Sequence, residues 1–144
     1  MTFLLDVNVL FVLHQPRHTS FKSVFQWFSE GKVSSFATCP ITQAGLMRLL
    51  NQPTGLDVFR SGEAREALRN LVRIPGHVFW PDIPPYLDAT DKFSRRMQGH
   101  RQITDAYLLG LARHHGGKLA TLDKAIASLA GPEFSSLVEL IPTR

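Results

Sequence analysis

The stretch GHRQITDAYLLGLARHHGGKLATLD, residues 99–123, decides the fold class of this chain. Its first half predicts a helix, because Thr104 is a suitable N-cap and the run that begins at Asp105 is largely apolar. A pair of glycines then marks the end of that helix. Residues 118–122 form a short apolar run that is typical of a buried strand, and Asp123 follows it. One acid therefore opens the predicted helix, and a second acid closes the predicted strand.

The N-terminal run TFLLDVNVL supplies a second predicted strand and a third acid. Residues 2–5 and 7–10 are almost wholly apolar, as expected for a central parallel strand buried on both faces. Asp6 and Asn8 interrupt this run. A buried polar group without a partner costs about 1–3 kcal/mol, and a buried charge costs more. Asp6 is therefore either a carboxylate that accepts backbone hydrogen bonds or a metal ligand at the C-terminal end of the strand.

Hydrophobic patterning along the rest of the chain predicts further short strands that alternate with helices. The order of these elements predicts an α/β fold, a three-layer α/β/α sandwich with a central parallel sheet, in a single domain over residues 1–144. The further strands are expected at residues 33–39, 78–80 and 137–141. Further helices are expected at residues 61–73, 88–97 and 124–130. Two more helices are expected, one that begins at Thr19 or Ser20 and ends at Gly31, and one that follows Thr42 as its N-cap.

Three acids, Asp6, Asp105 and Asp123, are the candidate catalytic and metal-binding residues. Strand ends and helix starts meet at one edge of a parallel sheet, which is where α/β proteins bind their ligands. We therefore expect the three carboxylates to lie close together. Mg²⁺ and Mn²⁺ are hard ions that prefer carboxylate oxygens, and they can activate water and offset the charge of a phosphoryl group. The set favours metal-dependent phosphodiester hydrolysis.

Four segments together resemble a known family. LLDVNVL near the N-terminus, TQAGLMRLL near the middle, and GHRQITDAYLLGLA followed by LATLD are similar to the PIN-domain ribonucleases, and specifically to VapC-type toxins of type II toxin–antitoxin systems. The resemblance covers nearly the whole chain. It implies the PIN fold, a Mg²⁺- or Mn²⁺-dependent endoribonuclease that cuts RNA, a VapB-like antitoxin partner and a homodimer.

One position departs from the family pattern. The residue after the middle threonine is commonly a glutamate that helps to hold the metal, and here it is Gln43. A neutral amide can still bond a metal-bound water, but it brings no negative charge. Gln43 is therefore predicted to support the metal ligands without binding the metal directly. Asn8 and Thr121 are predicted to do the same, because their side chains can orient carboxylates or bond phosphate. An alternative function follows, in which the chain is a catalytically weak module that binds RNA or antitoxin.

A basic segment precedes the second acid of the candidate site. Arg95, Arg96, His100 and Arg101 lie close together in the sequence, with no acid between Asp91 and Asp105. Cations beside a carboxylate cluster would offset its repulsion of a phosphate backbone, so these four residues are candidates for RNA binding. The alternative interpretation is a solvated helix end.

Composition agrees with a cytoplasmic protein. The net charge is +4, which permits nucleic-acid binding without requiring it. The single cysteine, Cys39, lies in an apolar run and is expected to be a buried structural thiol. The N-terminal run lacks the features of a signal peptide, and no apolar run approaches the ~20 residues that a membrane span needs.

Overall fold

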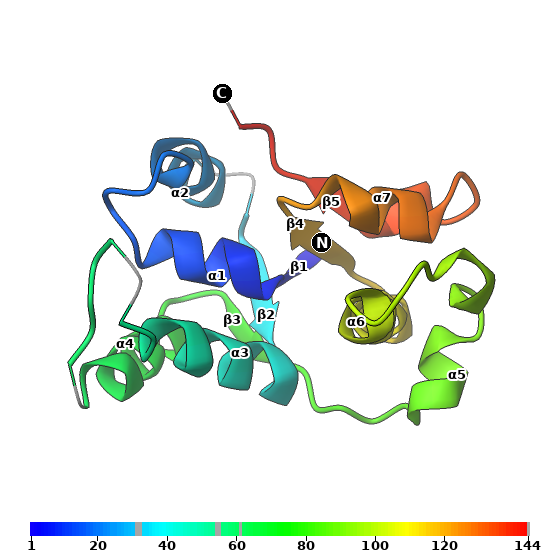
Figure 1. Ribbon diagram of the computed structural model, residues 1–144, viewed down its shortest axis with the longest axis horizontal. Coiled ribbons are helices and arrows are strands. Elements are labelled where there is room, and N and C mark those ends of the chain that lie inside the picture. The colour runs from blue at the N-terminus through cyan, green and yellow to red at the C-terminus, as the bar shows by residue number, and fades with distance from the viewer. Residues whose placement is uncertain (31–32, 54–55, 61, 144) are drawn as a thin grey trace.

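The computed structural model describes residues 1–30, 33–53, 56–60 and 62–143, and Figure 1 shows one sheet between two layers of helices. Within these residues the sheet has five strands, all parallel, in the order β3-β2-β1-β4-β5. The predicted three-layer α/β/α sandwich with a parallel sheet is confirmed. The strands are β1 (Thr2–Leu5), β2 (Ser35–Thr38), β3 (His77–Phe79), β4 (Lys118–Thr121) and β5 (Val138–Leu140).

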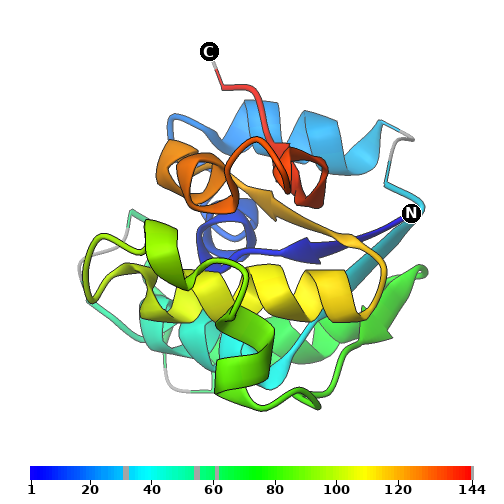
Figure 2. The same ribbon diagram turned by 90° about the vertical axis from the view of Figure 1, so that its right-hand side faces the viewer.

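The helices cover both faces of the sheet, as the two views show (Figures 1 and 2). One face carries α1 (Val7–Leu13), α2 (Phe21–Ser29), α3 (Pro40–Leu50) and α4 (Glu63–Val72). The other face carries α5 (Tyr86–Thr90), α6 (Gln102–His114) and α7 (Lys124–Ala130), with the short 3₁₀ turns η1 (Ser94–Arg96) and η2 (Ser135–Leu137).

Alternation along the central strand divides the interior into two cores. Phe3 and Leu5 of β1 pack into the core beneath α1 to α4, whereas Leu4 packs into the core beneath α5 to α7. Each of these side chains is at most 8% exposed. Successive residues of a strand point to opposite faces, so a strand covered on both faces is apolar at every position. This explains why residues 3–5 of β1 are all apolar, and it agrees with the place of β1 in the middle of the sheet.

The prediction that the first strand continues through residues 7–10 is wrong. The strand ends at Leu5, and Val7 begins helix α1, for which Asp6 is the N-cap. The Asp6 carboxylate accepts a hydrogen bond from the backbone N–H of Val7, which starts the helix. A short apolar run does not distinguish a buried strand from a buried helix, and Val9 and Leu10 are buried in either case.

Two predicted N-caps are also wrong. Helix α6 begins at Gln102, with Arg101 in the capping position, so Thr104 lies inside the helix and Asp105 in its first turn. Helix α3 begins at Pro40, with Cys39 as its N-cap. Proline is favoured in the first turn of a helix because its missing N–H has no partner there in any case.

Thr42 contributes to that cap from inside helix α3. Its hydroxyl accepts a hydrogen bond from the backbone N–H of Cys39 at 3.0 Å. The Cys39 side chain is fully buried, as expected of a structural thiol.

Several predicted elements are shorter in the structure. Residues 91–93 separate α5 from η1 where one helix over residues 88–97 was expected, and Pro85 is the N-cap of α5. Ser20 is the N-cap of α2, as predicted, and α2 ends at Ser29. The predicted helix end at Gly31 and the helix start at Ser61 lie outside the described residues. Over the part of the chain that the structure describes, every helix is too short or too polar to span a bilayer.

Candidate functional site

Asp6 lies at the C-terminal end of β1 and is only 5% exposed. Both of its carboxylate oxygens are hydrogen-bonded: Oδ1 accepts from the backbone N–H of Val7, and Oδ2 accepts from Oγ1 of Thr121, each at 2.8 Å. Burial raises the pKa of Asp6 above its ordinary value, and the two hydrogen bonds oppose that shift. Asp6 is thus held rigidly at the edge of the sheet.

Thr121 and Asp123 belong to the neighbouring strand, β4, and the turn after it. The Thr121 hydroxyl is fully buried and accepts a hydrogen bond from the backbone N–H of Asp123 at 3.0 Å. One carboxylate oxygen of Asp123 accepts from the backbone N–H of Ala125 at 2.9 Å, which caps helix α7. The second oxygen of Asp123 has no hydrogen bond among the described residues. The cap therefore orients the carboxylate and leaves one oxygen available.

Asp105 faces the other two acids from the first turn of α6. The pKa of Asp105 is raised to about 6, first by burial and then by the negative charges of Asp6 and Asp123. The three carboxylates are therefore coupled electrostatically, although they come from three separate parts of the chain. The fold thus brings Asp6, Asp105 and Asp123 to one edge of the sheet, and their role as metal ligands stays a prediction.

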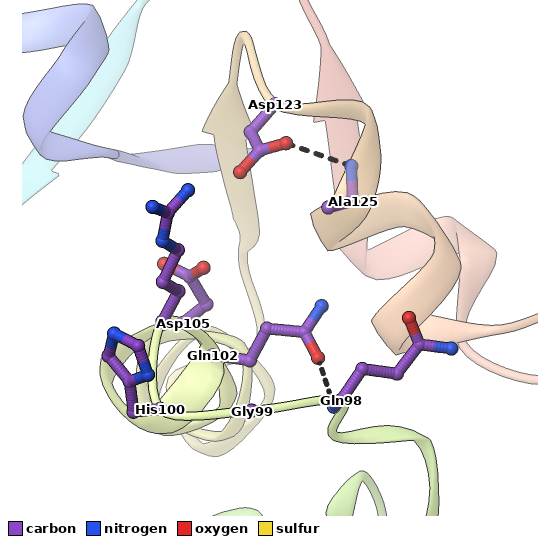
Figure 3. Close-up of a pocket in the computed structure, with 8 residues that line it drawn as sticks. Gln98, Gly99, His100, Gln102, Asp105, Asp123 and Ala125 are labelled. Carbon is purple, nitrogen blue, oxygen red and sulfur yellow. Dashed lines mark hydrogen bonds between the residues drawn. The ribbon is translucent and has the colours of Figure 1, made fainter.

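A pocket of about 480 Å³ opens between the start of α6 and the start of α7 (Figure 3). Asp105 and Asp123 line it, and Figure 3 shows both carboxylates projecting into the space between these two elements. Its other walls come from residues 98–102 and Ala125. Asp6 is not part of the lining, since it is more deeply buried than Asp105 and Asp123.

The donor set suits a hard divalent cation. Its oxygens come from carboxylates, and none of the ion pairs within the described residues involves Asp6, Asp105 or Asp123. Their mutual repulsion is thus uncompensated, and a cation would relieve it. In their present positions, no three acidic, histidine or cysteine side chains of the described residues lie close enough to share one ion. The arrangement fits a metal in charge and donor type, and the side chains must approach one another to enclose it.

Comparison with known families decides what kind of chain this is. The family model described as "PIN domain" matches residues 3–132. The chain belongs to the PIN-domain family. Two curated relatives of this PIN domain come from Mycobacterium tuberculosis. Ribonuclease VapC39 is 35% identical over 98% of this chain and 100% of its own length, and ribonuclease VapC29 is 40% identical over 99% and 98%. The resemblance inferred from the four sequence segments is confirmed.

Solved structures agree on the fold. VapBC2 from Rickettsia felis, crystallised with a DNA fragment from its promoter, superposes with a TM-score of 0.67 at 11% identity and covers 99% of this chain and 100% of the other. FitAcB from Neisseria gonorrhoeae superposes with a TM-score of 0.59 at 18% identity, over 88% of this chain and 92% of the other. At these identities the likeness establishes the shared fold alone.

Gln43 of this PIN domain lies in a different hollow from Asp105 and Asp123. Its side chain lines a groove of about 240 Å³ between α3 and α4. The amide Nε2 donates to Oγ1 of Thr38 at 3.0 Å, and the same hydroxyl oxygen lies 2.7 Å from Nε2 of His77. Asn8 is exposed in the first turn of α1. The metal-supporting roles predicted for Gln43 and Asn8 stay predictions.

The predicted RNA-binding residues divide into two groups. His100 and Arg101 line the same pocket as Asp105 and Asp123. Arg95 and Arg96 line a neighbouring hollow instead. Basic side chains therefore line both the pocket of the acids and the neighbouring hollow. Cations in these places would attract a polyanion that approaches a metal site.

Sequence reasoning missed two polar residues of the pocket, Gln98 and Gln102. The backbone N–H of Gln98 donates to Oε1 of Gln102 at 2.7 Å, which ties the segment before α6 to the helix itself (Figure 3). Glutamines carry no motif and are common on surfaces. The only sequence feature that could have indicated them is their closeness to Asp105. That feature was used to select the basic residues of the segment, and the glutamines were left out.

Proposed function

We propose that this PIN domain is a metal-dependent endoribonuclease that hydrolyses phosphodiester bonds in RNA and acts as the toxin of a toxin–antitoxin pair in the cytoplasm. The observation that carries the proposal is the coupled, uncompensated carboxylate cluster of Asp6, Asp105 and Asp123. The names of the curated relatives support RNA as the substrate, because they are called ribonucleases and match over nearly their full length.

In this proposal the three aspartates hold Mg²⁺ or Mn²⁺. When bound, such an ion lowers the pKa of a water nucleophile and offsets negative charge on the phosphoryl oxygens. Thr121 keeps Asp6 oriented through its 2.8 Å hydrogen bond, and the α7 cap orients Asp123. His100 and Arg101, at the wall of the same pocket, attract the phosphate that must approach the acids.

The proposal includes protein partners. The solved structures that share the fold are described as VapBC and FitAB assemblies, which supports a VapB-like antitoxin as the inhibitor of this chain. The family resemblance supports a homodimer in which residues 1–144 of each copy form one PIN domain. An antitoxin segment that covers the pocket of Asp105 and Asp123 would block access of RNA to the acids.

The test is cleavage of purified RNA by the antitoxin-free protein with Mg²⁺, with Mn²⁺ and with EDTA. We expect discrete fragments with a divalent ion, none with EDTA, and none from Asp105→Asn. Asp82→Asn is the matched control, because Asp82 is an exposed acid that does not line the pocket of Asp105. A folded protein that cuts no RNA with either ion contradicts the proposal and favours the alternative, a module that only binds RNA or antitoxin.

A further inference from the structure

Two further hollows lie next to the pocket of Asp105 and Asp123, along α7. A hollow of about 400 Å³ shares Gln98, Gln102 and Ala125 with the acidic pocket. A third hollow of about 410 Å³ shares Arg96 and Ser128 with the second. Because each hollow shares lining residues with the next, the three lie side by side from the start of α7 to the turn after it. We name this series of hollows the α7 groove.

The charge of the α7 groove changes along its length. Acidic side chains, Asp105 and Asp123, line only the end at the candidate site. The two distal hollows are lined by Arg95, Arg96 and neutral residues, and no acid is among the described residues that line them. A polyanion would thus be attracted along the groove and would meet carboxylates only where a cation is expected to bind.

Arg96 lies at the junction of the two distal hollows and lines both of them. A Cβ atom added to Gly131 would collide with the Arg96 guanidinium, so the absence of a side chain at Gly131 provides the space that Arg96 occupies. Gly131 also ends α7 with a φ of 71°, a conformation that favours glycine. The turn after α7 therefore leaves room for the Arg96 guanidinium beside the groove, and Arg96 remains exposed to solvent, where a phosphate can reach it.

The two distal hollows of the α7 groove offer contacts to a nucleic-acid backbone, and no aromatic side chain is among the described residues that line them. Among the described residues that line its three hollows, the only ring side chains are His100, at the acidic end, and Pro132. Proteins that grip bases of single strands use aromatic platforms, and phosphates are held by Arg, Ser and Gln side chains. The distal hollows provide the second kind of contact, through Arg95, Arg96, Gln98 and Ser128.

We propose that the α7 groove binds the backbone of single-stranded RNA on one side of the bond to be cut, without regard to its base sequence. This inference rests on the proposed function for its substrate, and it adds the path of the strand, from Asp105 and Asp123 past Arg95 to Arg96. The sequence preference of cleavage is then set outside the distal groove. An acidic peptide is the competing occupant, and the experiment separates the two.

The experiment measures RNA affinity in EDTA, where binding does not depend on metal or cleavage. Oligouridine and oligoadenosine are titrated by fluorescence anisotropy over a range of salt concentrations, with wild type and with the double variant Arg95→Gln, Arg96→Gln. The charge-matched control is Arg60→Gln, Arg73→Gln, two exposed arginines outside the α7 groove. Melting temperatures verify that all three proteins fold, and a polyglutamate peptide serves as the competing polyanion.

We expect the slope of log affinity against log salt to fall by about 1.4 in the groove variant, which is two phosphate contacts at ~0.7 each for single strands. The loss is expected to be equal for the two oligonucleotides, and the control slope is expected to match wild type. An unchanged slope in the groove variant, or a loss confined to one base, overturns the inference. Polyglutamate binding as tight as RNA binding and equally dependent on the two arginines would assign the groove to an acidic peptide.

The outcomes also separate this inference from the proposed function. If the wild-type protein cuts no RNA with any divalent ion but shows the expected change in salt slope, the groove assignment stands and the nuclease proposal fails. If the protein cuts RNA and the slope does not change, the nuclease proposal stands and the path of the strand lies elsewhere.

Discussion

The Thr121 hydroxyl donates a hydrogen bond to Oδ2 of Asp6 at 2.8 Å, across the junction of two adjacent parallel strands. An ionised Asp6 carboxylate can only accept this bond, and the same hydroxyl oxygen accepts a second bond from the backbone N–H of Asp123 at 3.0 Å. Thr121 thus connects two acids of the candidate site through one buried oxygen. It orients the cluster without facing the pocket.

Replacing Thr121 tests this connection. Thr121→Val keeps the shape of the side chain but leaves a buried Asp6 oxygen without its donor and the Asp123 N–H without its acceptor. We expect a loss of about 1–3 kcal/mol in the free energy of unfolding, measured by urea denaturation at neutral pH. Thr121→Ser restores the hydroxyl and is expected to retain most of the stability. Equal stability of the valine variant and wild type would contradict this role.

The raised pKa of Asp105 predicts that, without metal, the stability of the protein depends on pH. Its pKa in the folded protein is about 6, against an ordinary value of 3.8. Between these values the folded state binds more protons than the unfolded state, so the free energy of unfolding falls as pH rises through this window. Because Asp105 is partly exposed, solvent screening reduces the effect to about 1–2 kcal/mol.

The variant Asp105→Asn removes this titration. In EDTA above pH 7 we expect the variant to melt about 2–8 °C above wild type, and the difference to disappear below pH 4. Differential scanning calorimetry across this pH range makes the measurement. Asp91→Asn is the control for the loss of one acid, because Asp91 is exposed and does not line the pocket of Asp105. A constant difference at all pH values would show that the Asp105 charge is not the cause.

The chain of contacts from Gln43 through Thr38 to His77 predicts a linked titration. Gln43 donates to the Thr38 oxygen, so the Thr38 hydroxyl hydrogen is available to Nε2 of a neutral His77. Burial also lowers the pKa of His77. In Gln43→Glu the new carboxylate accepts the Thr38 hydrogen, and Thr38 then accepts from a protonated His77. We expect the pKa of His77 to rise.

Nuclear magnetic resonance titration of the His77 ring measures this change. Gln43→Met is the matched control, because it removes the amide donor without adding charge. A His77 pKa that is the same in the glutamate and methionine variants would refute the linkage.

The edge of the sheet where the acids meet could be predicted from the sequence. The prediction needs only the alternation of strands and helices along the chain. Asp6 and Asp123 each follow an apolar run, and such runs become neighbouring parallel strands in this fold. The exact ends of the strands and helices were harder to predict from the sequence. Residues 7–10 are apolar throughout, and it is the Asp6 cap that converts them into a helix. A cap is a side-chain contact, which periodicity does not encode.

The α7 groove was beyond sequence reasoning for a related reason. Arg95 and Arg96 were expected to accompany His100 and Arg101, because the four are close along the chain. The break between α5 and α6 directs the first pair toward α7 and the second pair toward the acids. Gly131, which makes room for Arg96, is 35 residues away from it in sequence. Such a pairing becomes visible only in three dimensions.

The central claim is that Asp6, Asp105 and Asp123 form one metal site, and calorimetric titration with Mn²⁺ tests it most directly. We predict that wild type binds Mn²⁺. Each of Asp6→Asn, Asp105→Asn and Asp123→Asn should weaken binding by at least roughly tenfold, a loss typical even of residues that only support metal ligands. Asp82→Asn should bind as wild type does. No Mn²⁺ binding by the folded wild-type protein, or an equal loss in Asp82→Asn, would contradict the claim.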